Sequence, residues 1–139
     1  MQQDFSKGYM DCLADLTFTN RVTEDMFAHN FEKMRSLGCY YIVVIECIAT
    51  RSIVASGTLL VEEKFIRDCC RVGHIEDIVV REAHQDKHFG TAVVRQLIEL
   101  AGKAGCNKCI LDCDGKTVPF YAKCGFEAKG RIQMSKAIT

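Results

Sequence analysis

Apolar side chains recur at helical spacing through the first part of the chain, and a polar break divides them into two helices. Residues 8–16 form the first candidate helix, and the polar stretch 17–20 follows it. The second helix begins after Thr23, whose hydroxyl suits an N-cap, and ends at Gly38. Its expected apolar face consists of Met26, Phe27, Phe31 and Met34.

Three segments rich in β-branched and aromatic residues follow. Residues 40–47 and 53–61 flank a short turn and predict a β-hairpin. Residues 74–80 form the third predicted strand, and its apolar residues point to both faces, as in a central strand covered on both sides.

The helical period returns between residues 90 and 104, and Gly105 ends that helix. A strand at 108–113, a short helix at 117–124 and a last strand at 126–134 complete the prediction. The expected buried stripe of the long helix consists of Val93, Val94, Leu97, Ile98 and Ala101.

The strand–helix–strand order between residues 74 and 113 sets the overall topology. Such a unit crosses over right-handedly and makes its two strands parallel. We therefore predict a mixed α/β fold, with a sheet covered by helices. Ligands of such sheets bind beyond the carboxyl ends of parallel strands, so the loops after Val80 and Cys113 are the expected site.

Composition limits the partners and the compartment. The chain has 139 residues, and we expect a single domain over residues 1–139. Lys plus Arg and Asp plus Glu number 18 each, so no positive field favours nucleic acid or an anionic membrane as partner. The longest apolar run, residues 40–45, is far shorter than the about 18 residues that span a membrane. The first residues lack a secretory signal, and we expect a cytoplasmic protein.

Cysteine is unusually frequent, with nine residues in the chain. An odd number without a secretory signal predicts mostly reduced thiols that pack as small apolar groups. Cys106 and Cys109 form a C-x-x-C pair, but the sequence offers neither a second pair nor histidines at ligand spacing beside it. We therefore predict no metal site.

A polar loop between the central strand and the long helix is the first candidate for chemistry. Free backbone N–H groups at a helix N-terminus attract anions such as phosphate, and a glycine there permits close approach. An ordinary strand-to-helix connection is the alternative interpretation. The candidate residues are Gln85, Asp86, Lys87, His88, Phe89, Gly90 and Thr91.

Carboxylates within predicted strands are the second candidate. Glu76 and Asp77 interrupt one apolar strand, and Asp112 interrupts the next. Burying an unpaired carboxylate is unfavourable, so these residues favour a functional role. Strict alternation would point Glu76 and Asp77 in opposite directions.

The short helix near residue 120 is the third candidate. Phe120 and Tyr121 point about 100° apart on a helix, so one can anchor it while the other faces a cleft. A phenol of pKa about 10 can donate a proton to a thiolate whose thiol pKa is about 8.5. A core tyrosine is the alternative. Lys64, Arg67 and Lys108 stand near strand ends, as does Arg71, where basic groups suit a substrate phosphate.

Taken in their order along the chain, the loop, the strand carboxylates and the short helix resemble the GCN5-related N-acetyltransferase superfamily. Within it they are most similar to the eukaryotic glucosamine-6-phosphate N-acetyltransferase family. The resemblance extends over residues 16–134, with its most specific stretches at 73–80, 110–114 and 118–126. It implies a mostly antiparallel mixed sheet, with one parallel strand pair splayed around acetyl-CoA and helices on both faces. The first strand usual in the family is expected to be missing.

The resemblance also implies an activity. Acetyl would pass from acetyl-CoA to the 2-amino group of glucosamine 6-phosphate by direct attack in a ternary complex, for the synthesis of UDP-N-acetylglucosamine. The implied partner is a second copy of the chain, in a homodimer whose subunits share substrate pockets. The implied catalytic residues are Tyr121, Asp77 and Asp112.

Binding residues follow from the same resemblance. For acetyl-CoA it implies the strand residues Ile78, Val79 and Val80, the loop residues 85–91, and Thr117, Phe120, Tyr121 and Lys123. For the amino sugar it implies Thr17, Lys64, Phe65, Ile66, Arg67, Glu76, Asp77, Asn107, Lys108 and Asp112, with Lys136 beside the position of a family arginine.

Other functions remain open at this point. The same fold could acetylate another small amine or a peptide, although the basic set favours an anionic acceptor. A non-catalytic acyl-CoA-binding module and a thiol-redox or zinc protein are the further alternatives.

Overall fold

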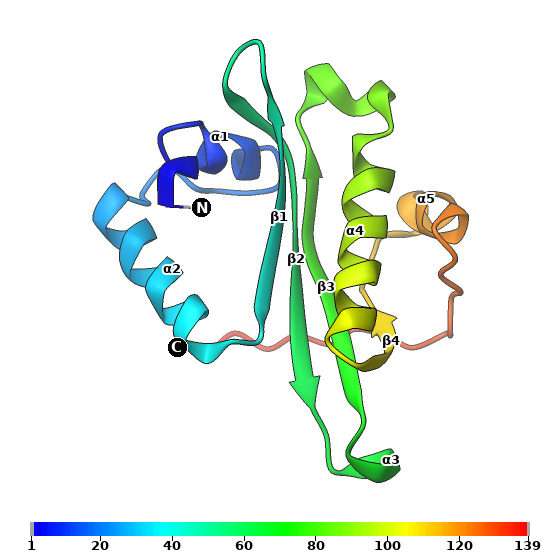
Figure 1. Ribbon diagram of the computed structural model, residues 1–139. Coiled ribbons are helices and arrows are strands. Elements are labelled where there is room, and N and C mark those ends of the chain that lie inside the picture. The colour runs from blue at the N-terminus through cyan, green and yellow to red at the C-terminus, as the bar shows by residue number, and fades with distance from the viewer. Residues whose placement is uncertain (1, 139) are drawn as a thin grey trace.

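The computed structural model describes residues 2–138. Within these residues four strands form one sheet in the order β1-β2-β3-β4 (Figure 1). β1 (Tyr40–Cys47), β2 (Ser52–Glu63) and β3 (Arg71–Val80) are successively antiparallel, and β4 (Cys106–Ile110) runs parallel to β3. The predicted mixed sheet with one parallel pair is confirmed, and in the described part of the chain no strand precedes β1.

Helices cover both faces of the sheet, as predicted (Figure 1). α1 (Tyr9–Ala14) and α2 (Glu24–Leu37) lie on one side, and α4 (Phe89–Lys103) lies on the other. α5 (Val118–Lys123) stands beside α4. The remaining short turns are η1 (Gln2–Asp4), α3 (Ile66–Cys69), η2 (Glu82–Lys87) and η3 (Gly115–Thr117).

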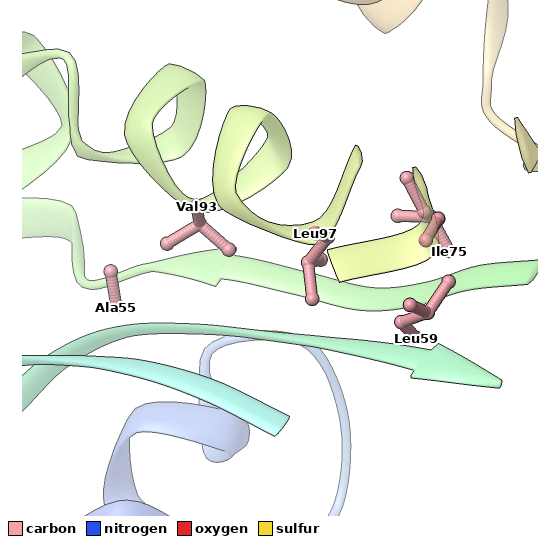
Figure 2. Close-up of a cluster of buried hydrophobic side chains, with 6 residues drawn as sticks. Ala55, Leu59, Ile75, Val93 and Leu97 are labelled. Atoms are coloured by element: carbon pink, nitrogen blue, oxygen red, sulfur yellow. The ribbon is translucent and has the colours of Figure 1, made fainter. Parts of the chain in front are cut away.

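The main core fills the space between α4 and the sheet (Figure 2). Leu59 and Ile75 point from the strands toward Val93 and Leu97 of α4, and all four side chains are buried. Each such side chain stabilises the fold by about 1.5–3 kcal/mol on burial. Four of the five residues expected in the helix stripe are buried, and Ile98 is half-buried.

A second, aromatic core lies on the opposite face. The Phe27 ring lies 5.4 Å from the Phe5 ring and 5.7 Å from the Tyr9 ring, above Ile53 and Val79. The expected apolar face of α2 is only partly correct, because Phe27 is its one buried residue and Met26 is exposed. Capping is as predicted, since the Thr23 hydroxyl accepts a hydrogen bond from the Met26 amide.

The strand predicted at residues 126–134 is wrong for the single chain. Residues 127–138, which we call the C-terminal tail, are all exposed and contain no strand. Ile132, Met134 and Ile138 are 87%, 90% and 97% exposed. Figure 1 shows the tail running from beside α5 across the lower part of the molecule. A strand requires a neighbour for its backbone N–H and C=O groups, and apolar spacing alone does not provide one.

Two backbone features depart from regular geometry. Asp77 has φ 53° within β3, and Thr58 pairs with Glu76 whereas Ser56 pairs with Val79. β3 therefore contains an extra residue, a β-bulge, at this point. In the turn between β2 and β3, Arg67, Asp68 and Cys69 have φ of 52°, 57° and 58°. Three consecutive left-handed L-residues are strained, and such strain concentrates at functional segments.

No helix among residues 2–138 combines the length and the apolar character needed to cross a bilayer.

Candidate active site

The site is built where β3 and β4 separate. β4 pairs with β3 from Arg71 to His74 and then ends at Ile110, so the rest of β3 loses its parallel neighbour. The bulge at Asp77 lies in this unpaired stretch, followed by Ile78, Val79 and Val80. The backbone N–H and C=O groups of β3 that face the gap are thus available to pair with a bound ligand, which fits the acetyl-CoA binding predicted for residues 78–80.

The loop between β3 and α4 forms a second side of the candidate site. His88 links η2 to α4 in the left-handed conformation (φ 59°), and its side chain does not cap α4. The first N–H groups of a helix have no intrahelical acceptor, and the helix dipole adds positive potential there. Gln85 fixes the loop to the strand, because its side-chain amide donates to the Val80 carbonyl at 3.2 Å.

α5 closes the site from the far side. A Cβ added to Gly90 would lie 3.1 Å from Cζ of Phe120, so the ring rests against the start of α4. The Tyr121 ring contacts Phe120 at 4.9 Å and Phe126 at 6.1 Å. Phe120 is therefore the residue of the pair that anchors α5 to α4, and Tyr121 is half-buried.

The Tyr121 phenol keeps its proton at neutral pH. Burial raises its pKa above the ordinary value of 10.0, and the thiols of Cys113 and Cys124 add to the effect. The role that the resemblance implies for Tyr121, stabilising or protonating a departing thiolate, stays a prediction. A protonated phenol is able to donate a hydrogen bond to an anion.

Three carboxylates gather beside the bulge. Burial raises the pKa of Glu76, and the charges of Asp77 and Asp112 raise it further. The bulge at Asp77 breaks the strict alternation predicted for Glu76 and Asp77, and the charges of Asp77 and Asp112 both act on Glu76. A concentration of negative charge of this kind attracts a cationic amine.

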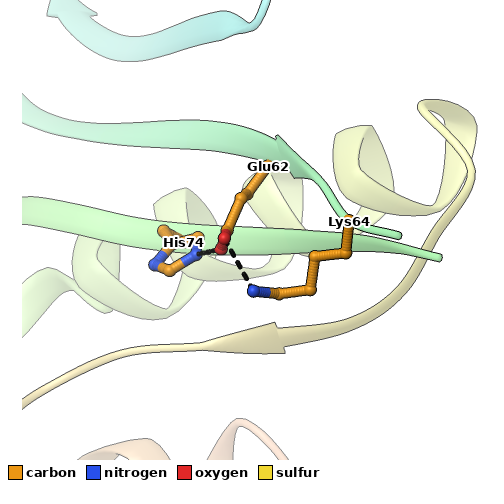
Figure 3. A network of polar contacts seen from close by, with 3 residues as sticks. All are labelled: Glu62, Lys64 and His74. Atoms are coloured by element: carbon orange, nitrogen blue, oxygen red, sulfur yellow. Dashed lines mark hydrogen bonds and ion pairs between the residues drawn. The ribbon is translucent and has the colours of Figure 1, made fainter. Parts of the chain in front are cut away.

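Basic groups lie on the same face of the sheet. Glu62 Oε1 accepts from Lys64 Nζ at 2.6 Å, and Glu62 Oε2 lies 2.6 Å from His74 Nε2 (Figure 3). Glu62 pairs with Val72, and Val72 pairs with Lys108, so Lys108 shares this face by register. His74 and Glu76 share it by alternation. We call Glu62, Lys64, His74, Glu76 and Lys108 the polar face.

Among residues 2–138 there is no group of three or more His, Cys, Asp or Glu side chains arranged to hold a metal ion. All nine cysteines are free.

Comparison with known proteins identifies the family. The family model described as the acetyltransferase (GNAT) family matches residues 7–126. The chain belongs to the GNAT family. This confirms the family expected from residues 73–80, 110–114 and 118–126.

Individual GNAT relatives cover nearly the whole chain. Glucosamine 6-phosphate N-acetyltransferase 1 of Dictyostelium discoideum is 43% identical over 133 residues, which cover 95% of this chain and 83% of the relative. The Arabidopsis thaliana enzyme named glucosamine 6-phosphate N-acetyltransferase is 42% identical over 134 residues, 96% of this chain and 89% of the relative. A crystal structure of glucosamine-6-phosphate N-acetyltransferase from Arabidopsis thaliana superposes with a TM-score of 0.96 at 41% identity and covers 100% of this chain and 95% of that chain.

The remaining residues predicted for the GNAT site lie at its margins. Thr17 follows α1 and is exposed. Thr117 donates from its hydroxyl to the Asp114 carbonyl at 3.0 Å, and Lys123 is exposed at the end of α5. Asn107 accepts from the Arg71 amide at 3.3 Å, where the register between β3 and β4 shifts.

The turn residues do not reach the acid cluster of their own chain. Phe65 and Ile66 are 96% and 64% exposed, and Arg67 lines a surface hollow together with Asn107. Arg71 begins β3, and its six-residue separation from Asp77 corresponds to roughly 20 Å of strand. Lys136 lies in the C-terminal tail. The turn residues and Arg71 therefore stand apart from the acid cluster along their own chain.

Sequence reasoning missed Glu62 and His74 as members of the site. The available signal was the two-residue spacing of Glu62 with Lys64 and of His74 with Glu76, which in an extended chain places each pair on one side. Only the register between β2 and β3 shows that the two pairs meet.

Proposed function

We propose that this chain transfers the acetyl group of acetyl-CoA to the 2-amino group of glucosamine 6-phosphate. The observation that carries the proposal is the pairing of acidic and basic groups on one sheet face beside the gap between β3 and β4. Glu76, with Asp112 and Asp77, supplies a negative pole. Lys64 and Lys108 supply a positive pole on the same face.

The separation of the two poles suits a small zwitterion. His74, which contacts the Glu62 carboxylate that also binds Lys64, precedes Glu76 by two residues, about 7 Å along the strand. An amino sugar phosphate carries an ammonium at one carbon and a phosphate at another, and would bridge the poles. The names of the relatives, both of which are glucosamine 6-phosphate N-acetyltransferases, support the same acceptor.

Binding and reaction place opposite demands on the acid cluster. Carboxylates favour the ammonium form, whereas attack on a thioester requires the neutral amine. Glu76 is suited to receive the amine proton, because its pKa is raised. Most of the acceleration would come from alignment of amine and thioester, a contribution of about 7–11 kcal/mol in favourable cases.

The other residues hold the acetyl donor and its leaving group. The backbone of residues 78–80 would pair with the pantetheine arm, and residues 85–91 with the N-terminus of α4 would bind the pyrophosphate. Tyr121 would donate a hydrogen bond to the departing thiolate. Direct transfer needs no acetylated cysteine, which leaves the nine thiols outside the chemistry.

The arrangement also supports a homodimer with shared pockets. Arg67 lies too far along its own chain to meet a phosphate whose amine is at Asp77. The exposed Phe65 and Ile66 beside it, and the apolar residues of the C-terminal tail, would be covered by a second copy. Free thiols fit a reducing cytoplasm as its location. There the product would serve UDP-N-acetylglucosamine synthesis.

Release of CoA tests the proposed reaction directly. The purified chain is mixed with acetyl-CoA and either glucosamine 6-phosphate or unphosphorylated glucosamine, and free thiol is followed with time. We expect a strong preference for the phosphorylated sugar. Equal rates would refute the role of the basic pole, and turnover only with another amine or a peptide would refute the proposed acceptor.

A further inference from the structure

One hydrogen bond joins the end of α1 to the start of η2, and the proposed reaction does not use it. Asp15 is the C-cap residue of α1, and its Oδ2 accepts a hydrogen bond from the Glu82 amide at 3.3 Å. The two residues are 67 positions apart in the sequence. Both line one surface hollow, together with Arg81 and His84. The contact therefore connects the α1 side of the sheet with the loop that leads to α4.

The carboxylate of Asp15 does not stabilise the helix on which it stands. The C-terminus of a helix carries partial negative charge, so an acidic side chain there is unfavourable. The first N–H groups of η2, in contrast, lack intrahelical acceptors, and its N-cap residue Arg81 makes no side-chain cap. Asp15 supplies this missing acceptor from another element, and aspartate is among the residues that cap helix N-termini best.

Of the two segments that this bond joins, α1 is the better packed. Tyr9 and Cys12 are 6% and 0% exposed, and Tyr9 lies among the aromatic rings of the second core. In η2 and the residue after it, residues 82, 83 and 85–88 are exposed. The bond from Asp15 therefore holds η2 in place, whereas α1 has its own support from the core.

The position of η2 also sets the start of α4. His88 links η2 directly to α4, and the His84 ring stacks on the Phe89 ring at 6.3 Å. In Figure 1 the chain rises from the end of β3 through this loop and returns into α4. A displacement of Glu82 would thus be passed on to residues 85–91, the segment proposed to bind the pyrophosphate of acetyl-CoA.

We propose that Asp15 is a positioning residue for acetyl-CoA, because its carboxylate fixes η2 and, through η2, the loop that binds the pyrophosphate. The inference rests on the proposed function, which places the donor along residues 78–80 and 85–91. Asp15 acts through the Glu82 amide and not by contact with the donor. Its effect is therefore confined to acetyl donors that carry a pyrophosphate.

Two substitutions at position 15 separate the hydrogen bond from other effects. Asp15→Ala removes the acceptor, whereas Asp15→Asn keeps a side-chain oxygen that can accept from Glu82. Asp11→Ala is the matched control, because it makes the same change at an exposed residue in the first turn of the same helix.

Two acetyl donors show where the effect arises. KM and kcat are measured with acetyl-CoA and with S-acetylpantetheine, which has the same thioester and arm but no pyrophosphate. Glucosamine 6-phosphate is the acceptor in both cases. Calorimetry with CoA gives the affinity of each protein without turnover, and thermal unfolding reports on the fold.

The proposal predicts a specific pattern. Asp15→Ala should raise the KM for acetyl-CoA by roughly three- to tenfold, the size of a lost helix cap, with little change in kcat. Its kcat/KM with S-acetylpantetheine, its KM for glucosamine 6-phosphate and its melting temperature should stay near the wild-type values. Asp15→Asn should restore most of the affinity for acetyl-CoA, and Asp11→Ala should follow the wild type throughout.

The outcomes distinguish this inference from the reaction itself. If glucosamine 6-phosphate is acetylated but Asp15→Ala leaves the KM for acetyl-CoA unchanged, or impairs both donors equally, the inference is wrong while the function stands. If CoA binds more weakly to Asp15→Ala in calorimetry but the sugar phosphate is not acetylated, the function is wrong and the role of Asp15 stands. If CoA does not bind to the wild type, both are wrong.

Discussion

Tyr121 shows how burial prepares a single side chain for its role. Its pKa is raised by burial and by two neighbouring thiols, so the phenol remains a donor throughout the pH range in which the amine reacts. Tyr121→Phe removes the donor but keeps the ring that contacts Phe120 and Phe126. We expect kcat to fall roughly 10²-fold, the typical loss for a removed donor to a developing anion.

Steady-state kinetics and thermal unfolding check this prediction together. The KM for acetyl-CoA and the melting temperature should change little, because packing is retained. An unchanged kcat would assign Tyr121 to packing alone.

Glu76 illustrates a conflict between stability and function. Its raised pKa means that the folded state disfavours the charged form, because of partial desolvation of this exposed side chain and of repulsion from Asp77 and Asp112. Glu76→Gln should therefore increase the free energy of unfolding at pH 7 by a few tenths of a kcal/mol, typical of relieved like-charge contacts at exposed positions. It should also weaken binding of the amino sugar.

The pH dependence of this stabilisation has a definite sign. A raised folded-state pKa penalises the wild type only where Glu76 would ionise in the unfolded chain, so the difference should grow as pH rises through the ordinary value of 4.5 and vanish below it. Denaturant unfolding of the wild type and of Glu76→Gln at pH 3.5 and at pH 7 measures the difference in their unfolding free energy at each pH. A larger advantage of the variant at pH 3.5 would contradict this assignment.

At the residue scale the sequence marks candidates for chemistry but not their geometry. Asp112 and Tyr121 stand out as candidates because a carboxylate in an apolar predicted strand and an aromatic pair on a short helix are each unusual, although Asp112 follows β4, which ends at Ile110. The left-handed Asp77 was not predictable, because no glycine marks the bulge in β3. The bond between Glu62 and His74 depends on strand register, which the sequence constrains only weakly.

At the scale of elements, the packing of α4 against the sheet depends on Gly57 in β2. A Cβ at this position would lie 2.5 Å from Ile78, 2.6 Å from Val93 and 2.9 Å from Leu97. Gly57→Ala should therefore destabilise the fold by about 1–3 kcal/mol, as overpacking of a filled core does. Because Ile78 belongs to the strand proposed to bind pantetheine, the KM for acetyl-CoA should rise as well.

Gly102, near the end of α4, is the control for this substitution. A Cβ there meets nothing within 4 Å. Gly102→Ala should leave kinetics unchanged and stabilise the chain by up to about 1 kcal/mol, the helix preference of alanine over glycine. Thermal unfolding compares the melting temperatures of Gly57→Ala and Gly102→Ala. Similar melting temperatures would refute the packing argument.

Elements were predictable from sequence where their signals are local. The Thr23 cap and Gly38 predicted where α2 begins and ends, and the apolar stripe predicted α4. The β-branched runs predicted the hairpin. The strand expected at 126–134 failed because strand formation depends on a partner strand, which local pattern does not reveal. β4 likewise ends at Ile110 instead of residue 113, where its neighbour diverges.

At the scale of the whole molecule, the C-terminal tail and the β2–β3 turn are the segments that a second copy would cover. Deletion of residues 131–139 removes Ile132, Met134 and Ile138, which are exposed in one chain. We expect light scattering to give a dimer for the full chain and a weaker dimer for the truncated chain. A full-length monomer at micromolar concentration would contradict the shared pocket.

The β2–β3 turn, with its three left-handed residues, has a further consequence for the measured enzyme activity. If Arg67 completes the phosphate site of a neighbouring subunit, each isolated chain has only part of a pocket. Specific activity per milligram would then decline when the enzyme is diluted below the dissociation constant of the dimer, and mixing an Arg67→Ala chain with an Asp112→Asn chain would restore partial turnover. Progress curves at several enzyme dilutions would reveal this even before any complex is crystallised.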